Sequence, residues 1–177
     1  MKKLILGSAI MAVLGVASSA MAAPNAGTVN FTGNITTATC ELALQDNAGS
    51  GIANVDLGTL STTSTGGTPV NFKLVPQTPD CLAKTQANIN WTSSTLSASG
   101  IDNATKKGGT NAYLQVKTTN ATQTGDAGIL KQGQSSFDYN VTGGVKSFNY
   151  TATLMKPAAA LTAGPFNASA SYMITYR

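Results

Sequence analysis

The stretch "GTVNFTGNITTATC" (residues 27–40) alternates apolar and polar residues, as a strand with one buried face does. Val29, Phe31 and Ile35 fill apolar positions, and Gly33 stands where a further apolar residue is due. Glycine inside a strand marks a bulge or a place that another backbone approaches closely. These residues alone leave both explanations open: an ordinary first strand with a bulge, or a strand that packs closely against another backbone at residue 33.

The residues before this strand have the layout of a secretory signal peptide. In "MKKLILGSAIMAVLGVASSAMA" (1–22), two lysines precede an apolar run, and small residues end in "AMA". The apolar run is too short for an uncleaved membrane anchor, which needs ~20 residues. We therefore expect residues 1–22 to be removed, leaving an exported chain of 155 residues (177 minus 22) that begins at Ala23 and inserts in no membrane.

Composition excludes most chemistry. Without the two lysines of the signal peptide, nine basic residues face seven acidic ones, a net charge of +2 with no basic cluster, so we expect no nucleic-acid binding. The chain has no histidine, which rules out Ser-His-Asp and Cys-His catalysis and imidazole metal sites. The acidic residues are scattered in turn-forming stretches, so a catalytic carboxylate pair is not expected either. We predict no enzyme activity, no catalytic residues, no metal and no cofactor.

Cysteine usage agrees with export. Cys40 and Cys81 are the only two cysteines, 41 residues apart, and this spacing does not suit a metal site. In an oxidising compartment an isolated pair forms a disulfide by default. A reactive thiol pair would need a C-x-x-C arrangement or a nearby histidine, and neither is present.

The rest of the chain consists of short alternating segments separated by turns that contain glycine or proline. We expect strands at 54–61, 70–75, 87–94, 112–119, 136–141, 147–155 and 169–176, and mobile surface loops at 61–69 and 98–110. Strands of this length and spacing, with almost no helical pattern, predict one all-β domain, a sandwich or a barrel.

Five features in this order resemble a fimbrial subunit, or pilin, of the bacterial chaperone–usher pathway, similar to the rod subunits of type 1 pili. They are "GTVNFTGNI" leading to Cys40, "FKLVPQTPDC" ending at Cys81, "SFNYTATL" near the end, Gly164 as the fourteenth residue from the carboxyl end, and Tyr176 as the penultimate residue. Together they span the whole mature chain. The N-terminal extension before "GTVNF" is short for this family.

The resemblance implies an incomplete immunoglobulin-like sandwich that a donor strand from another chain completes. Residues 23–36 would be the donor extension and residues 37–177 the pilin domain. The donor positions would be Val29, Phe31, Gly33 and Ile35. The groove that accepts a chaperone strand, and later a donor strand, would involve Gly164, Tyr172, Ile174, Tyr176 and Arg177, the last through its carboxylate.

The same resemblance implies a function and partners. The chain would be a structural subunit of an adhesive pilus at the cell surface, reached through the periplasm. Its partners would be a periplasmic chaperone, an outer-membrane usher and other copies of itself or related pilins. A single domain argues against a tip adhesin. The alternative is a secreted β-sandwich that acts alone as a carbohydrate-binding module.

Overall fold

The computed structural model describes residues 26–35 and 41–177, and nearly all of its regular structure is β. One four-residue helix and one short 3₁₀ turn are the exceptions in this part of the chain. The elements in chain order are β1 (Ala26–Ile35), β2 (Leu42–Asp46), β3 (Asn54–Thr59), β4 (Val70–Pro76), α1 (Pro79–Leu82), β5 (Gln86–Thr92), β6 (Ile101–Asp102), β7 (Tyr113–Thr118), η1 (Gly125–Gly128), β8 (Ser136–Asn140), β9 (Phe148–Met155) and β10 (Phe166–Tyr176).

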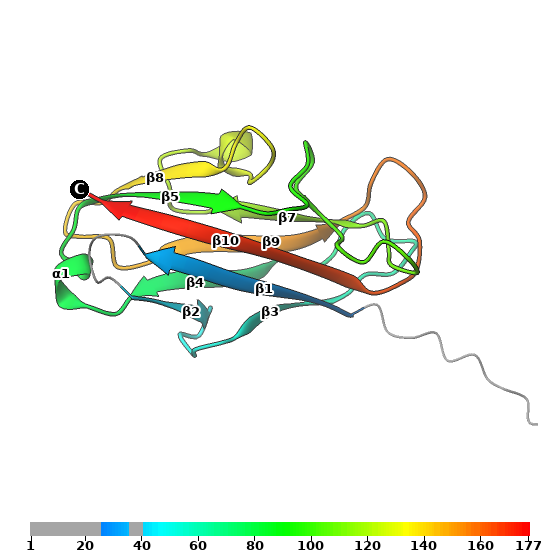
Figure 1. Cartoon of the computed structure of the whole chain (residues 1–177), viewed down its shortest axis with the longest axis horizontal. Coiled ribbons are helices and arrows are strands. Elements are labelled where there is room, and N and C mark those ends of the chain that lie inside the picture. Colours follow the sequence, from blue (N-terminus) through cyan, green and yellow to red (C-terminus); the bar gives the residue numbers. More distant parts are fainter. Residues whose placement is uncertain (1–25, 36–40) are drawn as a thin grey trace, which may run out of the picture.

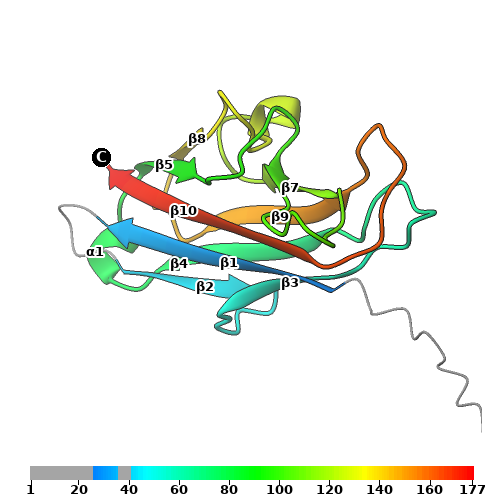
Figure 2. The same ribbon diagram turned by 45° about the vertical axis from the view of Figure 1, so that its right-hand side comes forward.

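Two five-stranded sheets face each other. One has the order β3-β1-β10-β5-β8 and the other β2-β4-β9-β7-β6. Figures 1 and 2 show β1 and β10 side by side across one layer, with β4 and β9 in the layer behind. Every described strand pair is antiparallel except β1 with β10, which is parallel. The expected all-β sandwich is therefore confirmed.

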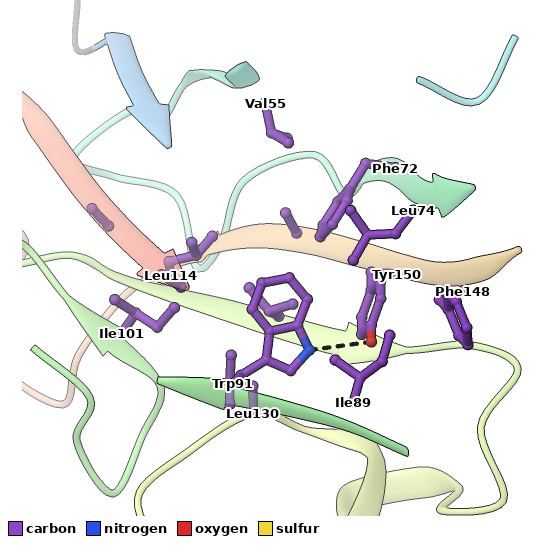
Figure 3. Close-up of a cluster of buried hydrophobic side chains, with 14 of the residues drawn as sticks. Val55, Phe72, Leu74, Ile89, Trp91, Ile101, Leu114, Leu130, Phe148 and Tyr150 are labelled. Carbon is purple, nitrogen blue, oxygen red and sulfur yellow. Dashed lines mark hydrogen bonds between the residues drawn. The ribbon is translucent and has the colours of Figure 1, made fainter. Parts of the chain in front are cut away.

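The core lies between the sheets because each strand turns alternate residues inward. Buried and non-buried positions alternate strictly along β8 and β9, and β10 follows the same period. Figure 3 shows side chains from both layers meeting in this core, with Trp91 of β5 next to Tyr150 of β9. These two residues are 1% exposed.

A chain of hydrogen bonds runs through the apolar core and holds the two sheets together. Trp91 Nε1 donates to the Tyr150 hydroxyl at 3.1 Å, and the Tyr139 hydroxyl donates to the same oxygen at 2.7 Å. Tyr139 Oη also lies 3.0 Å from Thr118 Oγ1. Burial raises the pKa of Tyr139 to about 12 and that of Tyr150 well above its usual range. Both hydroxyls therefore stay protonated.

Replacing Tyr150 with phenylalanine is expected to lower the free energy of unfolding by about 1–3 kcal/mol, because it removes the buried hydroxyl that accepts hydrogen bonds from Trp91 Nε1 and the Tyr139 hydroxyl. Urea unfolding followed by the fluorescence of Trp91, the single tryptophan, measures the change. Tyr113→Phe is the matched control, since Tyr113 is only partly buried and should change stability by less than about 0.5 kcal/mol. Equal losses in the two variants would contradict a structural role for the hydrogen-bond chain.

The strands expected at 54–61, 70–75, 87–94, 112–119, 136–141 and 147–155 match β3, β4, β5, β7, β8 and β9 within two residues at each end. The last strand begins at Phe166, three residues earlier than expected, and β2 was not anticipated.

The segment 98–110 is not a loop that lies wholly on the surface. It contains β6 and four buried residues: Gly100, Ile101, Asn103 and Thr110. Asn103 fixes the segment by hydrogen bonds to neighbouring backbone groups. The segment 61–69 carries only isolated pairing, such as the bridge from Gly66 to Met155.

Candidate functional site: the position of the first strand

The first strand completes a sheet that would otherwise be split. β1 lies between β3 and β10, and in the described residues no other strand joins those two. It pairs with β10 in parallel from Gly27 to Ile35 and with β3 in the antiparallel sense near its start, from Ala26 to Asn30. In Figures 1 and 2 it runs along most of the C-terminal strand, whose end extends past it. We call this place between β3 and β10 the β1 position.

The inward face of β10 beside the β1 position carries residues of very different size. Phe166, Ala168, Ala170 and Ile174 are at most 4% exposed, whereas Tyr172 and Tyr176 are partly buried. Tyr172, Ile174 and Tyr176, which the resemblance assigned to a groove, lie at alternate positions of β10 and so share one face of the strand. The two alanines were not singled out from the sequence, although their spacing by two from Tyr172 would have placed them on the same face.

The register between β1 and β10 shows which residue lies beside Gly33. Beside the inward residues of β10, the register pairs Val29 with Ala168, Phe31 with Ala170, Gly33 with Tyr172, and Ile35 with Ile174. Gly33 is therefore at the level of a tyrosine, and Phe31 is at the level of an alanine.

The two tyrosines at the end of β10 pack against aromatic residues of the core. The ring of Tyr172 lies 5.3 Å from that of Trp91, and the ring of Tyr176 lies 6.3 Å from that of Phe148. Burial raises the pKa of both tyrosine hydroxyls. The Tyr176 hydroxyl is buried and has no hydrogen-bond partner among the residues that the structure describes.

The last residue continues the pairing of β10 with β5. The backbone N–H of Arg177 donates to the carbonyl of Gln86 at 2.9 Å, and its side chain is exposed. Nearby on β8, the amides of Asn88 and Gln123 donate to the carboxylate of Asp138 at 2.8 and 3.0 Å. These hydrogen bonds, with a smaller contribution from the charge of Arg177, lower the pKa of Asp138.

The start of β10 is held by a buried amide and a close glycine. Asn103 Nδ2 donates to the carbonyls of Thr110 and Pro165, each at 2.8 Å. Its Oδ1 accepts from the backbone N–H groups of Thr105 and Asn167 at 3.0 and 2.9 Å, so the amide is fully used.

Gly164 lies just before this start, with φ of +148°, in contact with the backbone at 108–110. Sequence reasoning identified Gly164 but missed Asn103, because one asparagine stands out little in a chain so rich in asparagine.

A search of the described residues for a metal centre finds none. They contain no group of three histidine, cysteine or acidic residues close enough to hold a metal ion. In the same part of the chain, no helix has the length and apolar character needed to cross a membrane. The feature that remains for function is the β1 position.

Comparison with known proteins identifies the family of the chain. A family model described as "Fimbrial protein" matches residues 29–177, from within β1 to the last residue. The K99 fimbrial protein of Escherichia coli is 39% identical over 165 residues, which cover 88% of this chain and 89% of that one. The F107 fimbrial protein of Escherichia coli is 31% identical over a 182-residue alignment that covers both chains completely. The chain belongs to the fimbrial protein family.

Family membership decides two sequence predictions. The resemblance to a fimbrial subunit is confirmed, and the chain is a structural subunit of a pilus and not an enzyme. An isolated carbohydrate-binding module is correspondingly disfavoured.

The structure places the four expected donor positions of this fimbrial subunit together on one strand, β1, within its own sheet. It also places Tyr172, Ile174 and Tyr176 on the neighbouring strand β10. Gly164 and Arg177 lie just beyond the two ends of β10. In the single chain, therefore, the N-terminal strand itself occupies the place that the resemblance assigned to a strand from another molecule.

Of the two cysteines of the subunit, Cys81 lies in α1 and is 3% exposed, and its Sγ accepts a hydrogen bond from Thr78 Oγ1 at 2.8 Å. Cys40 lies outside the described residues.

Proposed function

We propose that this fimbrial subunit polymerises head-to-tail by donor-strand exchange. Residues 26–35 of one copy leave their own sheet and enter between β3 and β10 of the next copy. The observation that carries the proposal is the β1 position: an N-terminal strand separates β3 from β10, so the same strand from another copy could take its place. Backbone pairing supplies affinity in such strand addition. The contact joins two different surfaces, so it propagates into a filament instead of closing into a dimer.

The short connection after β1 limits what the strand can do within its own chain. In Figures 1 and 2 the carboxyl end of β1 and the amino end of β2 lie at the end of the molecule that holds α1. Seven residue steps separate Ile35 from Leu42 and reach at most about 25 Å.

Turning β1 around would move Ile35 by about 26 Å along the sheet, with a further ~10 Å between the sheets. The connection is therefore too short, and within one chain β1 can enter only in parallel to β10. A strand donated by a second copy has no such restriction.

A chain that closes on itself must be kept open until it assembles. We propose that a periplasmic chaperone captures the exported chain before β1 closes, and that an outer-membrane usher replaces the chaperone strand by the donor strand. In this scheme residues 1–22 are removed as a signal peptide, residues 23–36 form the donor extension, and residues 37–177 form the pilin domain. The product is a cell-surface fimbria that supports adhesion.

We also propose that Cys40 and Cys81 form a disulfide. The backbone N–H of Gln77 donates to the carbonyl of Glu41 at 2.9 Å, and Glu41 directly follows Cys40. Gln77 lies two residues before α1, which contains Cys81. The residue that follows Cys40 therefore lies beside the segment that leads to Cys81.

The double variant Ile174→Ser, Tyr176→Ala is expected to lose co-purification with the chaperone and to give no filaments by electron microscopy. Both residues lie on the inward face of β10, where an incoming strand would contact them. The matched control is Met173→Ser on the outward face of the same strand, where Met173 is 49% exposed. A second control, Val116→Ser, damages the core on β7, away from the β1 position.

Undiminished co-purification of the double variant would show that β10 is not the docking strand. Equal loss in Val116→Ser would show that general destabilisation, and not the β1 position, causes the effect.

A further inference from the structure

We propose that Thr122 and Gln123 block the outer edge of β8, and that this block, together with the charge of Asp138, stops two copies of the subunit from pairing through β8. β8 is the outermost strand of the sheet β3-β1-β10-β5-β8. Figures 1 and 2 show it beyond β5, away from β1, so the block is separate from the proposed donor exchange. An open strand edge is a template for pairing with another chain.

The backbone groups in the middle of β8 point away from the sheet. Along an antiparallel ladder, successive residues face alternately toward the partner strand and away from it. Just before β8, the carbonyl of Ser135 accepts from the N–H of Trp91 at 2.8 Å. Just after β8, the N–H of Val141 donates to the carbonyl of Thr85 at 2.9 Å. The odd-numbered residues therefore face β5, and the N–H and carbonyl of Asp138 face the outer edge.

The loop after β7 occupies both of these outward groups. The N–H of Thr122 donates to the carbonyl of Asp138 at 2.7 Å, and the N–H of Asp138 donates to Gln123 Oε1 at 2.9 Å. One donor and one acceptor are what a residue of an added antiparallel strand would offer at this point. The side chain of Gln123 therefore takes the place of a backbone carbonyl. A strand from another copy can pair with the middle of β8 only after it displaces both groups.

The blocking loop is held in place at several points. Asn120 Nδ2 donates to the carbonyl of Ser147 at 2.8 Å, and Asn120 Oδ1 accepts from the N–H of Asn149 at 2.8 Å. These bonds attach the loop to the start of β9, in the opposite sheet. Gln123 Nε2 donates to the carboxylate of Asp138 at 3.0 Å, so the amide that accepts from this residue is also oriented by it.

The outer edges of β2 and β6 are covered in a different way. The N–H of Ile52 donates to the carbonyl of Leu44 in β2, and the N–H of Asp102 in β6 donates to the carbonyl of Thr95, each at 2.9 Å. In both places backbone bonds to backbone, so no particular side chain is needed. At β8 half of the cover is a side chain, and a single substitution can therefore open this edge.

The charge of Asp138 acts against the same association. Two copies of β8 can pair antiparallel along their whole length about a two-fold axis centred on Asp138, which is the middle residue of Ser136–Asn140. The two carboxylates would then lie directly opposite each other, and like charges in such a pair are destabilising. Hydrogen bonds from Asn88 and Gln123 lower the pKa of Asp138, so the carboxylate is charged at neutral pH.

Analytical ultracentrifugation of the folded subunit tests the block. Gln123→Ala removes the acceptor, and Asp138→Asn removes the charge while keeping an oxygen for the amide of Gln123. The double variant should form dimers with a dissociation constant roughly tenfold or more below that of the wild type, about the net worth of one or two hydrogen bonds. The matched control is Gln115→Ala with Asp138→Asn, because Gln115 lies on β7, between two other strands.

A second variant removes the other half of the block. Thr122→Pro with Asp138→Asn lacks the N–H that donates to the carbonyl of Asp138, and should associate in the same way. Thr122 and Asp138 are exposed and Gln123 is partly buried, so none of these changes touches the core. A cooperative thermal transition in each variant confirms that it is folded.

A single added cysteine reports where the copies meet. In Gln123→Ala with Asp138→Cys, the paired residues would have Cα atoms about 5.5 Å apart, within reach of a disulfide, so covalent dimers should appear on non-reducing gels. Gln123→Ala with Gln115→Cys should give roughly tenfold less, because β7 is not an edge strand. Hydrogen exchange followed by NMR should show faster exchange of the N–H of residue 138 in Gln123→Ala, with that of Trp91 unchanged.

The proposal fails if both folded double variants stay as monomeric as the wild type, or if the Gln115→Ala control associates equally. It also fails if the N–H of Asp138 exchanges no faster in Gln123→Ala, because Gln123 would then not be the block. Dimers that form without a disulfide at position 138 would show that the copies meet elsewhere and would overturn the assignment to β8. Donor exchange at the β1 position is untouched by any of these results.

Discussion

A chain without residues 26–35 is expected not to fold by itself. Removing β1 leaves β3 without its partner in the sheet and exposes one edge of β10. The apolar residues beside the gap include Val55 of β3 and Ala168 and Ile174 of β10, which are at most 4% exposed in the intact chain. Each large side chain that loses its burial costs about 1.5–3 kcal/mol. Summed over both sides of the gap, this cost approaches the entire free energy of unfolding of an ordinary domain.

Adding back the missing strand as a peptide is the sharpest form of this test. The truncated chain should give no cooperative thermal transition alone and should regain one with the peptide AGTVNFTGNI. The same peptide with Gly33→Asn is the matched control. It should fail to rescue, because residue 33 pairs with Tyr172 in the structure, and a side chain added at the level of this bulky residue is expected to overpack the sheet's apolar face. A cooperative transition in the truncated chain alone would show that β1 is dispensable for the fold.

The strand pattern of this subunit could be predicted because one face of nearly every strand is buried. Phe137 and Tyr139 of β8, for example, are at most 1% exposed, and the residues between and around them are exposed. Such alternation is visible in the sequence. β2 was missed because it lies at the edge of its sheet and all five of its residues are partly buried, so burial gives it no alternation.

Where β1 packs could not be predicted from its own residues. An alternating strand fits its own sheet and a neighbour's equally well, and only the pairing with β10 and β3 shows that it closes its own chain. The role of Ala168 and Ala170 also depends on register, because a small residue becomes informative only when a bulky one is known to lie opposite. Asn103 could not be found for a similar reason: its four partners come from segments that are up to 64 residues apart in the chain.

Gly164→Ala is expected to destabilise the folded subunit by about 3 kcal/mol or more. A Cβ at this position would collide with the carbonyl oxygen of Gly108 and would lie 2.7 Å from the carbonyl carbon of Gly109. Both neighbours are backbone and cannot move aside as a side chain could. The φ of +148° adds strain for any residue with a side chain. Differential scanning calorimetry measures the loss.

Gly133→Ala separates the collision from the strain. Gly133 also has a positive φ, +78°, but a Cβ there would meet nothing within 4 Å, so the expected cost is only about 1–2 kcal/mol. The larger loss at Gly164 should be accompanied by weaker strand acceptance, because Pro165 next to it accepts hydrogen bonds from Asn103 and Thr110 at the start of β10. If Gly164→Ala lowers the melting temperature no more than Gly133→Ala and the variant still accepts the strand, the backbone at 108–110 can move to make room for the Cβ. The start of β10 would then not be held by this contact.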